Sequence, residues 1–138
     1  MSAIPKINPF GALLNRPFWS VMIPTYQPVV TYLRQALESV LQQAPGPEQM
    51  KIEVVDDCSP GVDVAAIVKS IAGKRVEFSR TPRNLGLVGC FNTCIEQARG
   101  QWVHILNQDD YILPDYYKHL AHMAELHPEV SLLATRSF

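Results

Sequence analysis

The sequence predicts an α/β fold, built on a mostly parallel sheet with helices on both of its faces. From residue 19 onward, short β-type runs alternate with segments of helical periodicity. Such alternation requires crossover connections between parallel strands. The 138 residues are 47% hydrophobic and 18% charged, which is typical of one globular domain that buries its own core.

The first elements follow from local sequence signals. Residues 1–16 contain scattered Pro, Asn and Gly and are expected to form a tail, which leaves 17–138 as the domain. The apolar, β-branched run at 19–23 predicts the first strand, with Pro24 at its end. A helix can begin at Pro28, because proline is tolerated in a first helical turn.

The remaining elements are predicted from apolar runs, helical spacing and Gly or Pro breakers. In order they are a helix at 28–41 stopped by Pro45-Gly46-Pro47, a strand at 52–55, a helix at 64–71, a strand at 76–78, a helix at 87–98 terminated by Gly100, a strand at 102–106, a helix from Pro114 and a fifth strand at 130–134.

The residues after each strand are the candidates for chemistry, because ligands bind at the carboxyl ends of parallel strands. Asp56-Asp57 follow the second strand, and Asp109-Asp110 follow the fourth. Adjacent carboxylates repel each other and resist burial, so a cation or a ligand with donor groups would stabilise them. In the alternative interpretation, one Asp of each pair caps the next helix or turn.

Composition argues against several classes of protein. The net charge of -1 provides no field for nucleic acid or an anionic membrane. No apolar run approaches the roughly 20 residues that span a bilayer. Three cysteines do not suggest a disulfide framework, and residues 1–15 lack the pattern of a signal peptide. We therefore expect a cytoplasmic protein, with peripheral attachment at the inner membrane face left open.

Three other kinds of site fit the sequence less well. A dinucleotide site needs a Gly-rich turn after the first strand, and residues 24–28 contain no glycine. A receiver domain has a similar length, but its acidic pair would follow the first strand. A zinc site could use His119 and His122, but no further ligand has suitable spacing.

Four motifs in chain order resemble family 2 glycosyltransferases of the GT-A fold, over about residues 19–134. Each motif is weak alone, and the four together are specific. The family patterns I-P-T-Y-N, V-V-D-D-G-S, N-x-G and L-D-x-D-D are similar to Ile23–Gln27, Val54–Ser59, Asn84–Gly86 and Leu106–Asp110.

The resemblance implies transfer of a sugar from a nucleotide diphosphate donor, with UDP- or dTDP-sugars favoured, in polysaccharide biosynthesis. The acceptor would be a hydroxyl of a carbohydrate or lipid-linked molecule. Tyr26 would lay its ring against the base, and the backbone of Pro24 and Thr25 would bond the base edge. Asp57 would accept from the imino N–H of uracil or thymine, and Asn84 would contribute to donor binding.

The resemblance also implies a divalent cation. Asp110 would ligate Mn²⁺ or Mg²⁺, and Asp109 would hold the ribose or share the metal. Such ions prefer hard oxygen ligands and keep phosphate and water in their shell. The metal would act as a Lewis acid toward the departing nucleoside diphosphate.

The sequence departs from the family pattern at several positions. Asn107 replaces the first Asp of the metal motif, so Asp110 would have to contribute more to metal binding. Phe91 replaces the usual Arg, and Arg80 and Arg83 are the alternative candidates for a phosphate contact.

Two turn residues also differ from the pattern, since Gln27 stands in place of Asn and Cys58 in place of Gly. These substitutions affect the local geometry of both turns.

Family members continue into an acceptor-binding half that supplies the general base. Because this chain ends at Phe138, we expect an incomplete domain without a catalytic base, which self-associates to cover an open edge. The alternative is a nucleotide-binding or interaction module without catalysis.

Overall fold

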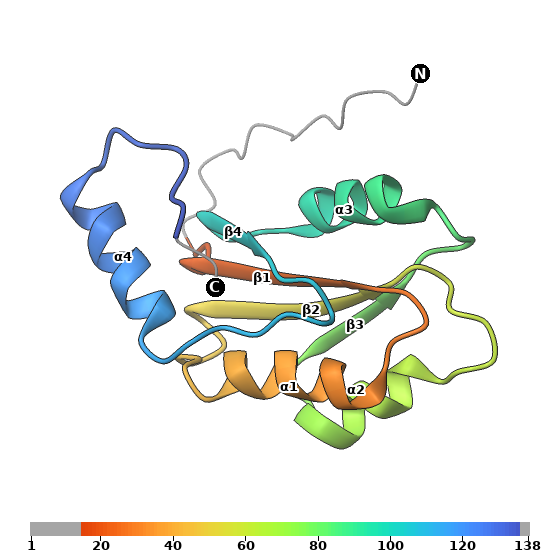
Figure 1. Ribbon diagram of the computed structural model, residues 1–138. Helices are drawn as coiled ribbons and strands as arrows, with labels where there is room; N and C mark the ends of the chain where they lie inside the picture. Colours follow the sequence, from red (N-terminus) through yellow and green to blue (C-terminus); the bar gives the residue numbers. More distant parts are fainter. Residues whose placement is uncertain (1–14, 136–138) are drawn as a thin grey trace.

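A computed structural model describes residues 15–135, which form one parallel four-stranded sheet in the order β3-β2-β1-β4, flanked by helices (Figure 1). The predicted fold class is therefore confirmed. The elements are β1 (Trp19–Thr25), α1 (Val30–Leu41), β2 (Met50–Asp56), α2 (Val64–Ala72), β3 (Glu77–Arg80), α3 (Gly86–Gln97), β4 (Trp102–Ile105) and α4 (Tyr116–Leu126).

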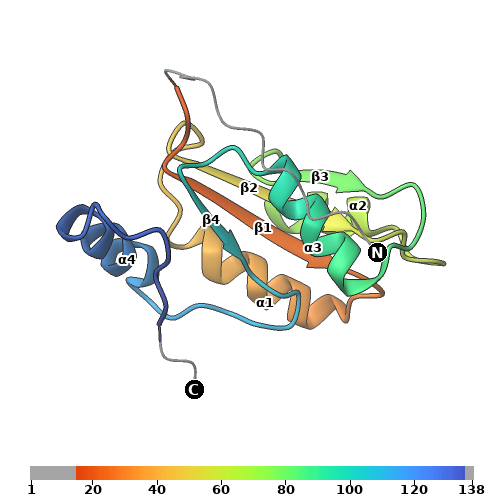
Figure 2. The ribbon, with the colours of Figure 1, turned by 90° about the horizontal axis from the view of Figure 1, so that it is seen from above.

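Helices cover both faces of the sheet. Helices α1 and α2 lie on one face and α3 on the other (Figure 1), and α4 lies to one side of the sheet (Figure 2). Successive strand residues point to opposite faces, so β1 contributes to two separate apolar clusters. Val21 and Ile23 join the larger cluster with α1, while Met22 packs with Cys90 and Cys94 of α3.

Strand β1 continues through Pro24 to Thr25, so the expectation that Pro24 ends the strand was wrong. Pairing with β2 extends to Thr25 and Asp56. On the other side, the N–H of Leu106 donates to the carbonyl of Met22 over 3.0 Å. The next donor of β1 on that side would be the nitrogen of Pro24, which carries no hydrogen. Proline therefore ends the β1–β4 ladder and leaves the chain after β4 free to turn.

The predicted fifth strand at 130–134 was also wrong. These residues form no strand in the described part of the chain, and Leu132 is 81% exposed. Leu133 still packs against the larger core cluster. Apolar, β-branched composition makes a strand only where a neighbour supplies ladder hydrogen bonds, and residues 15–135 pair no strand with this segment.

The amino-terminal prediction concerns residues that fall largely outside the described range, since a tail was expected at 1–16 and the description begins at residue 15. Arg16 donates hydrogen bonds to the carbonyls of Arg99 and Gly100, over 3.0 and 2.6 Å. Between residues 15 and 135, none of the helices has the length and apolar character to cross a membrane.

Gly100 has a packing role that differs from the predicted helix termination. Helix α3 ends at Gln97, with Ala98 as its extended C-cap. A Cβ atom on Gly100 would lie 2.4 Å from the backbone nitrogen of Ser20 and 2.6 Å from the carbonyl carbon of Trp19. The hydroxyl of Ser20 accepts the N–H of Gly100 over 2.8 Å. Glycine is therefore required by close approach of the backbone to β1.

His104 connects β4 to α4 through two tyrosines. Its Nδ1 lies 2.9 Å from the hydroxyl of Tyr117, and its Nε2 lies 3.4 Å from the hydroxyl of Tyr116. Burial lowers the pKa of His104 from 6.5 to about 4, because desolvation disfavours the charged ring. The folded protein thus holds a neutral imidazole at pH 7.

The depressed pKa of His104 predicts a loss of stability in acid. The stabilising contribution is present above pH 6.5 and is lost as the pH falls through about 4, because only the unfolded chain protonates the ring readily. Between pH 7 and pH 4, urea unfolding should show about 3 kcal/mol more destabilisation in the wild type than in His104→Gln. His122→Gln, which alters an exposed histidine of α4, is the matched control and should follow the wild type. Parallel pH profiles for wild type and His104→Gln would contradict the prediction.

Candidate functional site

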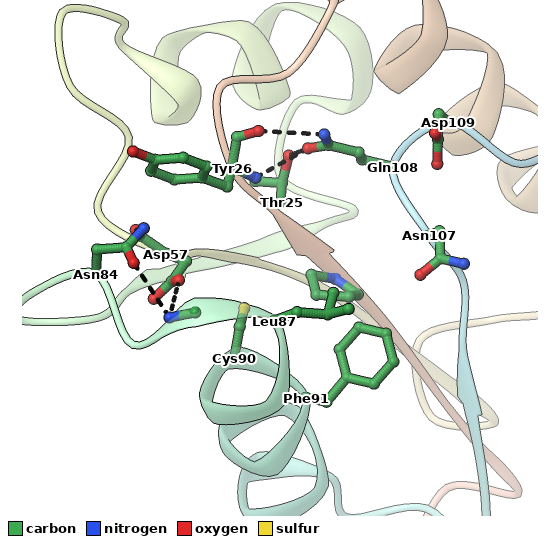
Figure 3. A pocket seen from close by; sticks show the side chains of 12 residues that line it. Thr25, Tyr26, Asp57, Asn84, Leu87, Cys90, Phe91, Asn107, Gln108 and Asp109 are labelled. Atoms are coloured by element: carbon green, nitrogen blue, oxygen red, sulfur yellow. Dashed lines mark hydrogen bonds between the residues drawn. The ribbon is translucent and has the colours of Figure 1, made fainter.

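A cleft of about 570 Å³ opens beside the carboxyl ends of β1, β2 and β4 and the first turn of α3 (Figure 3). The structure brings together six of the seven predicted site residues in its lining, namely Pro24, Thr25, Tyr26, Asp57, Asn84 and Asp109. Asp110 lies outside this set and lines a neighbouring cleft of about 540 Å³, which Asp109 also borders. The parallel sheet explains the convergence, because all its strands end at one edge.

Tyr26 lies in the turn after β1, with its side chain beside Asp57 and Asn84 (Figure 3) and 42% of its surface exposed. The next residue, Gln27, has a φ of 45°, in the left-handed region. Its N–H donates to the hydroxyl of Ser59 over 2.7 Å. This hydrogen bond joins the turn after β1 to the turn after β2 and holds the exposed ring at the mouth of the cleft.

Asp56 is fully buried and is the last residue of β2, directly before the turn. Its carboxylate accepts the N–H and the hydroxyl of Ser59, the latter over 2.5 Å, and lies 3.4 Å from the guanidinium of Arg80. The alternative interpretation, in which one Asp of the pair caps a turn, is confirmed for this residue. Arg80 also donates to the carbonyl of Ser59 over 2.8 Å, so its guanidinium is held by the turn.

Asp57 is buried against the amino terminus of α3. One oxygen accepts the N–H of Leu85 over 2.8 Å and the hydroxyl of Thr81 over 3.0 Å. The other oxygen accepts the N–H of Gly86 over 2.9 Å (Figure 3). The positive end of the helix dipole therefore faces a carboxylate of the protein itself. Asp57 has a structural role that the sequence motif did not reveal, and its predicted contact with a base remains a prediction.

The loop after β4 presents the second acidic pair. Asp109 and Asp110 are both exposed. The carboxamide nitrogen of Asn107 donates to Asp110 over 3.0 Å, and the N–H of Asp110 donates to the carbonyl of Asn107 over 3.1 Å. Asn107 thus orients Asp110 within the loop. An ionised aspartate, which the family pattern has at this position, has no hydrogen to donate and could not make this bond.

The oxygen atoms of this loop are suited to bind a hard divalent cation, provided that other ligands complete its coordination shell. Residues 15–135 contain no group of three or more His, Cys, Asp or Glu side chains that could hold a metal alone. The carboxylates of Asp109 and Asp110 and the side-chain oxygen of Asn107 are nevertheless the ligand types that Mg²⁺ and Mn²⁺ prefer. An ion here would need phosphate and water to complete its coordination, which is the usual arrangement for Mg²⁺.

Gln108 is a site residue that sequence reasoning did not identify. Its carboxamide oxygen accepts the N–H of Tyr26 over 2.9 Å and also contacts the hydroxyl of Thr25. Its nitrogen donates to the carbonyl of Tyr26 over 3.1 Å. The residue occupies the variable position of the L-D-x-D-D pattern, so the motif gives no signal for it.

The cleft is acidic and partly apolar. Its lining includes the carboxylates of Asp57 and Asp109, and no Lys, Arg or His is among its described lining residues. Leu87, Cys90 and Phe91 of α3 form an apolar wall (Figure 3). An anionic ligand would therefore meet repulsion here unless a cation accompanied it.

Comparisons with known proteins agree on one family. Residues 20–137 match the family model described as Glycosyl transferase family 2. The succinoglycan biosynthesis protein ExoO of Rhizobium meliloti is 34% identical over 121 residues, which are 86% of this chain and 33% of that protein. The poly(ribitol-phosphate) beta-N-acetylglucosaminyltransferase TarS of Staphylococcus aureus is 29% identical over 116 residues, which are 83% of this chain and 20% of that protein.

A solved structure shows the same likeness in three dimensions. The crystal structure of S. aureus TarS 1-349 in complex with UDP-GlcNAc matches with a TM-score of 0.70 and 25% identity, covering 86% of this chain and 37% of that one. The chain spans about a third or less of the length of the two curated relatives named above.

Removing the carboxylate of Asp57 should destabilise the fold. Asp57→Ala leaves the N–H of Leu85 without its acceptor and leaves the N–H of Gly86 with only its 3.2 Å bond to the side-chain oxygen of Asn84, so the free energy of unfolding should fall by about 2–3 kcal/mol. The control is Asp63→Ala, which removes a single N-cap bond to Ala66 at an exposed site and should cost about 1 kcal/mol. Urea unfolding followed by circular dichroism measures both. Equal losses in the two variants would show that the Asp57 network contributes no more than an ordinary cap.

Proposed function

Because this chain belongs to glycosyl transferase family 2, we propose that its cleft binds a uridine or thymidine diphosphate sugar together with a divalent cation, for transfer of the sugar to an acceptor hydroxyl. The observation that carries the proposal is the composition of one cleft. An exposed aromatic ring, a buried carboxylate and an exposed carboxylate loop meet there, and no basic side chain is among its described lining residues.

The nucleoside would bind between Tyr26 and Asp57. The half-exposed ring of Tyr26 offers an aromatic face to a flat base. The carboxylate of Asp57 accepts three hydrogen bonds from the protein, and a carboxylate has about four acceptor sites. One site is therefore left for an imino N–H such as that of uracil or thymine. TarS, whose structure has been solved with UDP and with UDP-GlcNAc, supports a uridine donor by similarity.

The diphosphate would lie toward the loop after β4. Asp109 and Asp110, with the carbonyl oxygen of Asn107, would hold Mn²⁺ or Mg²⁺ at the boundary of the two neighbouring clefts. When bound, such a cation stabilises negative charge on the departing nucleoside diphosphate. The hydrogen bond from Asn107 would keep Asp110 oriented for this role.

Deprotonation of the acceptor requires a general base, and we assign other roles to the two carboxylates that line the cleft. Asp57 is engaged by three donors, and Asp109 is proposed to share the metal. These are the carboxylates among the described lining residues of the cleft. We therefore place the base outside this set. The engagement of Asp57 by protein donors favours a second candidate function, nucleotide binding without catalysis by this chain.

Metal dependence is the direct test of nucleotide binding. UDP should bind with Mn²⁺ and lose about 10- to 100-fold in affinity in EDTA, because the acidic cleft repels the diphosphate and one or two charge-assisted contacts disappear. Uncharged uridine should bind equally in both buffers. In calorimetry, Asp110→Asn should reduce the gain in UDP affinity that Mn²⁺ provides. Asp115→Asn is the control, because Asp115 is exposed and lines neither cleft, and it should leave that gain unchanged. Equal UDP affinity with and without metal would refute the role of Asp110.

Turnover distinguishes the two candidate functions. General-base assistance is typically worth about 10²–10⁴-fold in rate, so this chain should bind a donor and hydrolyse it slowly, with no efficient transfer. The measurement is release of UDP or dTDP from a panel of donor sugars, with and without candidate acceptors. Efficient transfer by the chain alone would contradict this expectation and would identify a base within it.

A further inference from the structure

Gln108 makes an unusual pair of hydrogen bonds with the backbone of a distant residue. Its side-chain oxygen accepts the N–H of Tyr26 over 2.9 Å, and its side-chain nitrogen donates to the carbonyl of the same residue over 3.1 Å. A contact with the hydroxyl of Thr25 adds a third link. The side chain is half-buried. A residue in the hydrogen-bonded pair of an antiparallel ladder likewise bonds its partner through both its N–H and its C=O.

The backbone explains why a side chain is needed at this point. The β1–β4 ladder reaches the hydrogen bond from Leu106 to Met22, and Pro24 then offers no N–H to continue it. Beyond that point the segments that follow β1 and β4 diverge into the turn at 26–27 and the loop at 107–110. Within residues 15–135, every hydrogen bond between residues 24–27 and residues 107–110 is made by Gln108.

These two segments bear different parts of the proposed site. Tyr26 lies on the β1 side, and Asp109 lies on the β4 side, with Gln108 between them (Figure 3). A nucleoside diphosphate would contact both segments at once, through its base and through its metal-bound phosphates. Such a linked ligand gains affinity over its separate parts only when the two subsites are held at a fitting separation.

We propose that Gln108 is a positioning residue, which fixes the carboxylate loop relative to the base platform at Tyr26 so that one nucleotide can engage both. This inference rests on the proposed function. Gln108 itself needs no contact with the ligand, because its carboxamide is used by Tyr26 and Thr25.

The test compares a linked ligand with its fragments. Gln108→Met keeps the length of the side chain and removes its hydrogen bonds. In calorimetry, the Kd for UDP with Mn²⁺ should rise about tenfold, the scale of one lost polar link. The Kd values for uridine and for Mn²⁺ pyrophosphate should each change less than about twofold, because each subsite is retained.

Gln43→Met is the matched control. Gln43 is also half-buried, and its side chain donates to the carbonyls of Ser39 and Leu113, over 3.2 and 2.8 Å, outside the cleft. This variant should bind UDP like the wild type. Hydrogen exchange gives a readout without ligand. The exchange rate of the Tyr26 amide should rise about tenfold in Gln108→Met and should equal the wild-type rate in Gln43→Met.

The outcomes separate this inference from the proposed function. Wild-type UDP affinity in Gln108→Met, or equal weakening of UDP and both fragments, would overturn the positioning role while leaving the nucleotide site in place. Failure of the wild-type protein to bind UDP or uridine would refute the proposed function and the inference with it. Selective weakening of UDP together with faster exchange at Tyr26 would support both.

Discussion

Two adjacent buried carboxylates at the end of β2 impose the main constraint on this edge of the sheet. Asp56 and Asp57 are 0% and 2% exposed, and a buried carboxylate without donors is costly. Asp56 takes its donors from Ser59 and Arg80, whereas Asp57 takes them from residue 81 and the start of α3. The need to satisfy both carboxylates therefore ties β2 to the end of β3, to α3 and to its own turn.

The same network shapes the cleft. Ser59 bonds both Asp56 and the N–H of Gln27, so the turn bearing Tyr26 depends on the buried acid. Asp57 occupies the amino terminus of α3, a position that could otherwise attract a phosphate. With Phe91 in the wall where the family pattern has Arg, the cleft is left with carboxylates and apolar groups. This composition is the basis of the proposal that a nucleotide binds here together with a cation.

Departures from the family pattern have different structural consequences. Gln27 and Cys58 adopt left-handed backbone angles, with φ of 45° and 60°, although neither is glycine. Such conformations cost roughly 1–2 kcal/mol for an ordinary residue. The hydrogen bond from Gln27 to Ser59 and the proximity of the Arg80 guanidinium to the sulfur of Cys58, at 3.8 Å, accompany these conformations.

The sequence by itself determined the alternation of elements, the parallel sheet and the residues that meet at its carboxyl edge, because period-2 and helical apolar patterns are local and strand ends converge in this topology. Tertiary structure alone decided that Asp56 serves a turn, that Asp57 caps α3, that Gln108 reaches Tyr26 and that residues 130–134 form no strand. Each of these depends on a partner elsewhere in the chain, and the Gln108 contact joins residues 82 positions apart. No local pattern encodes which distant donor or strand neighbour a residue will find.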